Sequence, residues 1–296
     1  MTMLVLYIGN LTLDNLDGRL RVGGSGYYGG RALAEGFGAN VYALTHVDKK
    51  YRGLIVGIAS AYGIKILDIE SDEMPIFVIR NGKTVEFKGA SHKIPAHIIE
   101  AYLKFLNADI TVIAPVMREI EPDFIGIVRE YKGTIFSIDI QGFVRSLCNG
   151  SIKCVWNKKL DDVLAQADVV HGNLVEFCFT SSEKEALRHI SSISTTSKTA
   201  FLVSLDQRGT YVVHNGEIFY IPSLPVNKVD DVGAGDILLA VASYFRAKGL
   251  SVLESAVRGV IAASLKVENA YETWFHMDEI ETWYGSHIKK IQMVSL

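Results

Sequence analysis

The chain has 296 residues, of which 49% are hydrophobic and 21% are charged, so it can form one large domain or two unequal ones and has the composition of a globular protein. Its 30 basic and 33 acidic residues nearly balance. This balance gives no electrostatic reason to expect nucleic acid or an anionic membrane as a partner.

The first residues, MTMLVLYIGN, predict a core strand. They contain no basic region and their apolar run ends at Asn10, so we do not expect a signal peptide. No apolar run approaches the ~18 residues of a membrane span. We therefore expect a cytoplasmic protein in which Cys148, Cys154 and Cys178, which lack CxxC spacing, are reduced thiols. The histidines form no metal-binding motif.

Short apolar runs alternate with stretches of helical spacing along most of the chain. The runs are continuously apolar, as in parallel strands that are covered on both faces. The alternation predicts an α/β fold, in which helices flank a central, mostly parallel sheet, as a single domain over residues 1–296. The expected strands are 4–8, 41–44, 110–114, 134–140, 168–172 and 201–206, and the expected helices are 29–37, 52–62, 122–132, 158–167 and 183–193.

Two segments depart from this alternation. Residues 75–89 and 211–221 alternate in hydrophobicity around Asn-Gly pairs, the first of which is Asn81-Gly82. Such pairs are typical of tight β-hairpin turns. The first hairpin and the polar stretch 10–24 lie outside the βαβ pattern, so we expect a small projecting β-sheet from about 10–24 and 70–92. This sheet could close over a site as a lid; the alternative is an edge hairpin without such a role.

A buried helix is predicted from Ile237 to Lys248, and the sequence DDVGAGD precedes it. The small residues Gly233, Ala234 and Gly235 expose their amides, and the helix adds unpaired amides and the positive end of its dipole. Together these groups form a pocket for an anion such as phosphate.

The carboxylate of Asp236 stands inside this anion pocket. In a static phosphate site it would repel the ligand, whereas it is well placed to take a proton from a hydroxyl that attacks phosphorus. We expect the helix dipole to keep it ionised. The alternative is that Asp236 only caps the helix.

A second glycine-rich loop, GSGYYG from Gly24 to Gly29, matches the GxGxxG pattern of dinucleotide-binding proteins, with Asp48 at the distance of a ribose contact. The dinucleotide loop follows the first strand in a tight turn, but here a polar stretch separates Ile8 from Gly24. A nicotinamide-dependent dehydrogenase is therefore the weaker alternative. The sequence contains no GxxxxGK[ST] motif, so we do not expect a P-loop enzyme.

Several separated segments, in the expected order and over essentially the whole length, resemble the ribokinase-like (phosphofructokinase-B type) carbohydrate and nucleoside kinases. The most specific is DDVGAGD, which resembles the DTxGAGD motif of that family. The others are IGNLTLD (8–14), the glycine pair with its helix and strand (23–47), FSIDIQGFVR (136–145), NLVE (173–176) and FLVSLDQRGTYVV (201–213).

The resemblance implies a kinase that uses ATP and Mg²⁺ and has an alcohol group as acceptor. It makes Asp236 the general base and the amides of Gly233, Ala234 and Gly235 the anion hole, while Asn173 and Glu176 organise water around Mg²⁺. The implied substrate-binding residues are Asn10, Asp14, Gly24, Ser25, Tyr28, Asp139, Gln141 and Arg145, and the implied nucleotide-binding residues are Ser204, Asp206, Gly209 and Asn269.

The sequence departs from the family pattern at three places. Asp231 stands where Thr is usual, which leaves activation by a monovalent cation open. Asp206 stands where Gly is usual, which leaves the phosphate donor open. The usual substrate-binding Asn is absent near Tyr27 and Tyr28, and these tyrosines either stack on a substrate ring or pack in the hinge of the lid. For Arg145, the alternative to substrate binding is a salt bridge at a helix start.

The segment DIQGFVR and the tyrosines look closest to the smaller members of the family, which phosphorylate sugars or cyclic polyols such as inositol. A nucleoside is the alternative substrate. Asp206 and Asp231 also raise the alternative of a ligand-binding homologue that has lost activity. The resemblance and an exposed hairpin edge favour a homodimer through the lid.

Overall fold

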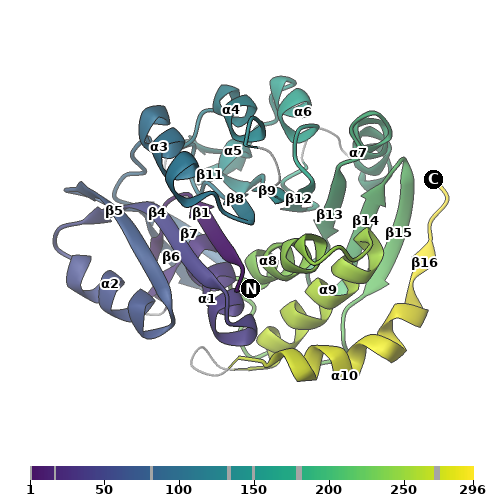
Figure 1. Ribbon diagram of the computed structural model, residues 1–296. Coiled ribbons are helices and arrows are strands. Elements are labelled where there is room, and N and C mark those ends of the chain that lie inside the picture. The colour runs from purple at the N-terminus through teal and green to yellow at the C-terminus, as the bar shows by residue number, and fades with distance from the viewer. Residues whose placement is uncertain are drawn as a thin grey trace.

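The structure is a computed structural model that describes residues 2–16, 18–80, 83–131, 135–148, 151–177, 182–269 and 274–296. Within these residues a ten-stranded sheet forms the main body, with helices on both faces (Figure 1). In spatial order its strands are β16 (Gln292–Met293), β15 (Glu217–Pro222), β14 (Gly209–His214), β13 (Ala200–Ser204), β12 (Val169–Asn173), β9 (Ile135–Asp139), β8 (Ile110–Ile113), β1 (Leu4–Ile8), β4 (Asn40–Asp48) and β5 (Ile64–Ser71).

The strands from β5 to β13 pair in parallel, and β14, β15 and β16 continue the sheet antiparallel at one edge. This arrangement confirms the predicted α/β class with a mostly parallel sheet. All six predicted strands are present, and their ends differ from the predicted ones by at most four residues. The predicted hairpin 211–221 forms β14 and β15.

Each face of the sheet has its own hydrophobic core, because the parallel strands are apolar on both sides. One core packs α1 (Ser25–Phe37), α2 (Arg52–Ala61), α8 (Ala234–Ala247), α9 (Val252–Glu268) and α10 (Met277–His287) against the sheet. The other packs α3 (Ala96–Leu106), α4 (Ile125–Arg129), α5 (Gln141–Val144), α6 (Lys159–Leu164) and α7 (Glu183–Ser197). Helix α8 is buried from Ile237 to Phe245, as predicted.

A second, four-stranded sheet lies over part of the main body. Its order is β3 (Arg19–Gly23), β2 (Thr12–Leu16), β6 (Ile76–Arg80) and β7 (Lys83–Lys88), with β2 parallel to β6 and both outer pairs antiparallel. Phe77 and Ile79 of this sheet pack on Val116 and Met117, which follow β8. The small sheet therefore covers the carboxyl ends of the main strands. The predicted turn Asn81-Gly82 lies outside the described residues.

Three groups of elements were not predicted. The hairpin of β10 (Arg145–Cys148) and β11 (Ser151–Cys154) lies beside β7 and places Ile152 against the apolar side of the small sheet. Strand β5 lies at the edge of the main sheet and is half polar, so it lacks the continuous apolar run of its neighbours. Helices α3 and α10 and the short edge strand β16 complete this set; the described chain also has 3₁₀ turns at Pro122–Phe124, Asp206–Arg208 and Ile288–Lys290.

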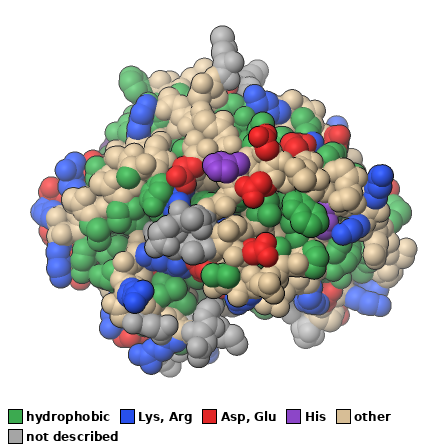
Figure 2. All heavy atoms as spheres, turned by 90° about the horizontal axis from the view of Figure 1, so that it is seen from below, with side chains coloured by type: hydrophobic (Ala, Val, Ile, Leu, Met, Phe, Trp, Pro, Cys, Tyr) green, Lys and Arg blue, Asp and Glu red, His purple; other side chains and the backbone are tan. Residues whose placement is uncertain are grey.

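The surface carries charges of both signs. On the face shown in Figure 2, Lys and Arg side chains lie mainly toward the edges, and Asp and Glu lie near the middle with a histidine. In the described part of the chain, no helix is long and apolar enough to span a membrane. Cys148 and Cys154 are free thiols, and Cys178 lies outside the described residues.

Candidate active site

The polar segments singled out in the sequence follow the carboxyl ends of the parallel strands. Asn10 follows β1, Gln141 follows β9, Asn173 ends β12 and Asp206 follows β13. Since these ends lie at one edge of the sheet, segments far apart in the sequence meet there, which is where open α/β sheets bind ligands. The turn before α8 faces the same region, because Gly235 contacts His171 of β12.

The two glycines of this turn have no room for a side chain. Gly233 is the N-cap of α8 with φ of 83°, and a Cβ there would lie 2.2 Å from the ring of Tyr28. A Cβ at Gly235 would lie 2.5 Å from Cε1 of His171. Aromatic rings therefore close the turn on both sides, and only glycine allows the backbone to approach them this closely.

The amides of this turn begin α8 and have no acceptor within the helix. The amide of Ala234 donates to the carbonyl of Asp231 at 3.2 Å, which closes the turn. The positive end of the helix dipole lies at the same place, so an anion in front of the turn is stabilised. The geometry is thus compatible with an anion hole at Gly233 and Gly235, whereas the predicted third amide, that of Ala234, would join it only by giving up its bond to Asp231.

Asp236, in the first turn of α8, lies among other titratable groups. Burial, with the carboxylate of Asp139 as the next cause, raises the pKa of Asp236 to about 7, although the Ser25 hydroxyl and His171 oppose this shift. Burial thus acts against the helix dipole that was expected to keep Asp236 ionised. A carboxylate with this pKa can both take up and release a proton near neutrality.

His171, which belongs to no sequence motif, connects Asp139 to Ser204. Its Nδ1 lies 2.7 Å from Oδ2 of Asp139, and its Nε2 lies 3.2 Å from Oγ of Ser204. The other oxygen of Asp139 accepts the amide of Gln141 at 2.9 Å. Burial lowers the pKa of His171, but Asp139 outweighs it and the pKa is raised. The sequence signal was its position near the end of a strand, two residues before Asn173.

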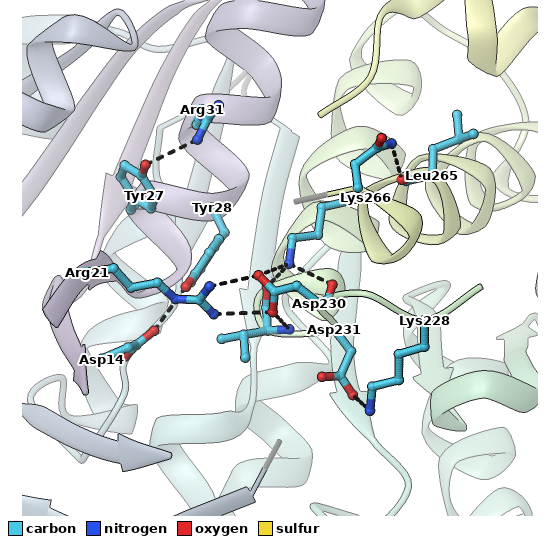
Figure 3. Close-up of polar contacts among 12 residues, drawn as sticks. Asp14, Arg21, Tyr27, Tyr28, Arg31, Lys228, Asp230, Asp231, Leu265 and Lys266 are labelled. Atoms are coloured by element: carbon cyan, nitrogen blue, oxygen red, sulfur yellow. Dashed lines mark hydrogen bonds and ion pairs between the residues drawn. The ribbon is translucent and has the colours of Figure 1, made fainter. Parts of the chain in front are cut away.

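The predicted substrate residue Asp14 lies on β2 of the small sheet and is 4% exposed. The hydroxyl of Thr12 donates to one of its oxygens at 3.0 Å. The hydroxyl of Tyr28 donates to the other, also at 3.0 Å (Figure 3). Burial raises the pKa of Asp14. Asp14 also influences the pKa of Asp236, so the structure brings these two carboxylates into one site.

The other predicted residues on this side differ in accessibility. Gly24 caps α1, and its carbonyl accepts the amides of Tyr27 and Tyr28 at 3.0 Å. Both tyrosine side chains are buried, which favours packing over stacking on a substrate ring. Asn10 is 1% exposed, and its side chain bonds to the His46 amide and to Ser91, so it serves the local structure.

On the opposite side of the site, Asn173 connects Glu176, predicted to act at the metal, with Asp206, predicted to bind the nucleotide. Its Nδ2 donates to Oδ1 of Asp206 at 2.8 Å, and its backbone amide donates to Oε2 of Glu176 at 2.9 Å. Arg145 lies 3.4 Å from the other oxygen of Glu176. Arg145 begins strand β10, so its salt bridge joins this hairpin to the NLVE segment instead of capping a helix. Burial raises the pKa of Glu176, and Arg145 opposes this shift.

The remaining predicted nucleotide residues lie in loops after β13 and α9. Asp206 has φ of 53°, a conformation that suits the glycine usual at this place. Gly209 has φ of 130°, and a Cβ there would lie 2.3 Å from the carbonyl oxygen of Ile221. Asn269 ends α9, and its side chain donates to the Leu265 carbonyl at 2.7 Å.

The residues present fit a magnesium ion that is held through water. Among the described residues, no group of three His, Cys, Asp or Glu side chains could hold a metal directly. Mg²⁺ keeps several waters and is commonly bound by one or two carboxylates together with phosphates. The carboxylate of Glu176, which accepts the backbone amide of Asn173, offers oxygens of this kind.

Comparisons with known proteins agree with this geometry. Residues 135–273 match the model of the pfkB family carbohydrate kinases. No curated protein matches the chain by sequence. Among solved structures, a pyrophosphate-dependent kinase of the ribokinase family, in complex with a pyrophosphate analog and myo-inositol, has a TM-score of 0.75 at 20% identity, covering 94% of this chain and 99% of that chain.

Two further solved structures extend over the same length. Phosphofructokinase-2 from Escherichia coli, in complex with potassium, has a TM-score of 0.72 at 17% identity and covers 98% of this chain and 99% of that chain. Ribokinase from Thermotoga maritima has a TM-score of 0.71 at 15% identity and covers 96% and 99%. The predicted resemblance and the fold it implied are therefore confirmed.

Proposed function

We propose that the chain, whose residues 135–273 match the pfkB family carbohydrate kinases, transfers the γ-phosphoryl group of ATP to a hydroxyl of a small carbohydrate or polyol. One observation carries this proposal. Asp236, with a pKa of about 7, stands in the first turn of α8 beside the glycine turn and is sensitive to Asp14 and Ser25 on the acceptor side.

In this reaction the acceptor hydroxyl gives its proton to the carboxylate of Asp236 as its oxygen forms a bond to the γ-phosphorus. The bond from the γ-phosphorus to the β,γ-bridging oxygen breaks, and ADP leaves with that electron pair. The amides of Gly233, Ala234 and Gly235 stabilise the charge on the transferred phosphoryl group. Behind the turn, Asp139 lies 2.7 Å from His171, and its negative charge raises the pKa of Asp236.

Asp14 is the principal ligand of the acceptor in this proposal. Its two oxygens are already oriented by Thr12 and Tyr28, so a substrate hydroxyl meets a carboxylate in a fixed position. Gly24 and Ser25, next to the small sheet, and Asp139, Gln141 and Arg145, at and after the end of β9, would also contact the acceptor, whereas the enclosed Asn10 supports the site from within.

On the donor side, Ser204, Asp206, Gly209 and Asn269 would contact the nucleotide. Asn173 and Glu176 would hold the water shell of Mg²⁺, which when bound neutralises charge on the donor phosphates. Asp206 adds a negative charge to this side, so the donor deserves a direct test. Pyrophosphate is the second candidate, because a kinase of similar fold uses it and Asp206 replaces the usual glycine.

The small sheet of β2, β3, β6 and β7 would act as the lid that excludes water from the phosphoryl group. A homodimer through this lid and a cytoplasmic location remain parts of the proposal. The alternatives from the sequence also remain: a nucleoside as acceptor, or a homologue that binds its ligand without turnover.

The experiment is a panel of sugars, cyclic polyols and nucleosides, each offered with ATP or with pyrophosphate, and scored by the phosphorylated product. We expect turnover with a sugar or polyol and ATP. Turnover restricted to nucleosides would replace the acceptor class, and turnover with pyrophosphate alone would replace the donor. Thermal stabilisation by an acceptor without product from any donor would support the binding homologue instead.

A further inference from the structure

Lys266 is a buried cation that the proposed reaction does not use. It lies on α9, is 0% exposed and points its Nζ at the turn that precedes α8 (Figure 3). Nζ donates to the carbonyl oxygen of Asp230 at 3.0 Å and to that of Val232 at 2.5 Å, and it lies 3.2 Å from Oδ2 of Asp230. Its three hydrogens therefore all face oxygens of the same turn.

These contacts act on the anion hole through the geometry of the peptide group. The carbonyl of Val232 and the amide of Gly233 belong to one planar trans peptide, so they point in opposite directions. Lys266 draws the Val232 oxygen toward α9, and the Gly233 amide consequently points away from α9. The amides of Val229 and Asp230 also donate to Val267, at 2.9 and 3.1 Å, which anchors the start of the turn on the same helix.

The shared carboxylate of Asp230 extends the network to the small sheet. Arg21 of β3 forms a bidentate pair with Asp230, at 2.8 and 3.3 Å. Burial lowers the pKa of Lys266 to about 8 although Asp230 opposes this shift, so the amine is mostly protonated at neutral pH. A buried ammonium surrounded by carbonyl oxygens resembles the way proteins bind K⁺, whose hydration shell is replaced by such oxygens.

We propose that Lys266 is a tethered cation that occupies a monovalent-cation position beneath the anion hole, acting as a positioning residue that orients the Gly233 amide. The inference rests on the proposed kinase function. It answers the question that Asp231 left open in the sequence, since a chain that carries its own cation needs none from solution. Catalysis in the wild type should therefore be the same in K⁺, Na⁺ or tetramethylammonium.

The test compares Lys266→Ala, which leaves a space lined by carbonyl oxygens, with Lys266→Met, which fills that space without charge. We expect both variants to lose about 10- to 100-fold in kcat with little change in KM for the acceptor, because the anion hole acts in the transition state. Ammonium or K⁺, but not tetramethylammonium, should restore at least part of kcat in Lys266→Ala and none in Lys266→Met.

Thermal unfolding gives a second readout that needs no substrate. Ammonium should raise the melting temperature of Lys266→Ala by about 2 °C or more over tetramethylammonium, and should not do so for the wild type or Lys266→Met. Arg258→Met is the matched control, because Arg258 is another buried cation of α9 whose partner, Glu281, lies at 2.6 Å and away from the turn. Its loss should lower stability without any response to ammonium.

The outcomes separate this inference from the proposed function. If no acceptor in the panel is phosphorylated, the kinase proposal fails, but the cation-selective melting of Lys266→Ala still decides the inference. A folded Lys266→Ala that retains wild-type kcat, or that responds to no cation, would overturn it. If Lys266→Ala does not fold in any cation, the wild type decides: activation by K⁺ of more than about twofold contradicts a tethered cation, and indifference supports it.

Discussion

The contact between Gly235 and His171 predicts that one added methyl group disturbs the anion hole. In Gly235→Ala the new Cβ would lie 2.5 Å from Cε1 and 3.1 Å from Nε2 of the imidazole. An ordinary carbon contact is about 3.5 Å or more, so the ring or the turn must move by about 1 Å. Such a movement stretches the bonds of His171 to Asp139 at 2.7 Å and to Ser204 at 3.2 Å.

The magnitude follows from these contacts. Overpacking a filled site costs about 1–3 kcal/mol, and weakening a buried hydrogen bond costs about 1 kcal/mol more. We therefore expect the free energy of unfolding to fall by about 2–4 kcal/mol. A displacement of about 1 Å at the reacting groups lowers the rate by about 10²-fold, so kcat should fall by a similar factor.

The assay is urea unfolding together with kcat on the best acceptor. Gly57→Ala is the control, because a Cβ at Gly57 in α2 meets nothing within 4 Å, and it should leave kcat unchanged and stability equal or slightly higher. In a His171→Ala background, Gly235→Ala should cost much less, since the ring that it meets is gone. Wild-type stability and kcat in Gly235→Ala would refute this description of the turn.

Four further predictions concern the acid and its neighbour Asp139, the donor side and the small sheet. Since the pKa of Asp236 is raised to about 7 and the base must be ionised, kcat/KM should rise as pH increases through about 7; a flat profile from pH 5 to 8 would contradict it. Asp139→Asn removes a charge that raises the pKa of Asp236, so the rise of kcat/KM with pH should move to lower pH. An unchanged pH profile would show that Asp139 does not act on Asp236. Asp206→Gly should lower KM for ATP, because it removes a negative charge from the donor side, and an unchanged or higher KM would contradict this. Arg21→Met breaks the ion pair with Asp230 and should raise KM for the acceptor about 3- to 10-fold, while the far-UV circular dichroism spectrum stays unchanged. An unchanged KM would mean that the pair does not hold the small sheet in place.

The parts of the fold that depend on the pattern of adjacent residues could be predicted from the sequence. Continuous apolar runs identified the covered parallel strands, and the glycines before Ile237 identified the turn, because both signals lie within a few adjacent residues. Strand β5 was missed because an edge strand buries only part of its surface and reads as half polar. The β10–β11 hairpin was missed because its strands are short and follow directly on a predicted active-site segment.

The parts of the site that depend on long-range contacts could not be predicted from local sequence patterns. His171 belongs to no motif, and its importance comes from Asp139, Ser204 and Gly235, which are distant in sequence. Lys266 reads as one more residue of a helix until α9 is placed beneath the turn. The pKa of Asp236 likewise depends on burial and on Asp139, neither of which is visible in the sequence around the turn.

The central claim is that Asp236 accepts the proton of the acceptor hydroxyl, and the most direct measurement is kcat of Asp236→Asn on the best acceptor of the panel. Asparagine preserves the size of the side chain but cannot take up the proton, so kcat should fall by about 10²- to 10⁴-fold and the melting temperature should not decrease. An Asp236→Asn enzyme with wild-type kcat would contradict the assignment of the base and the reaction built on it.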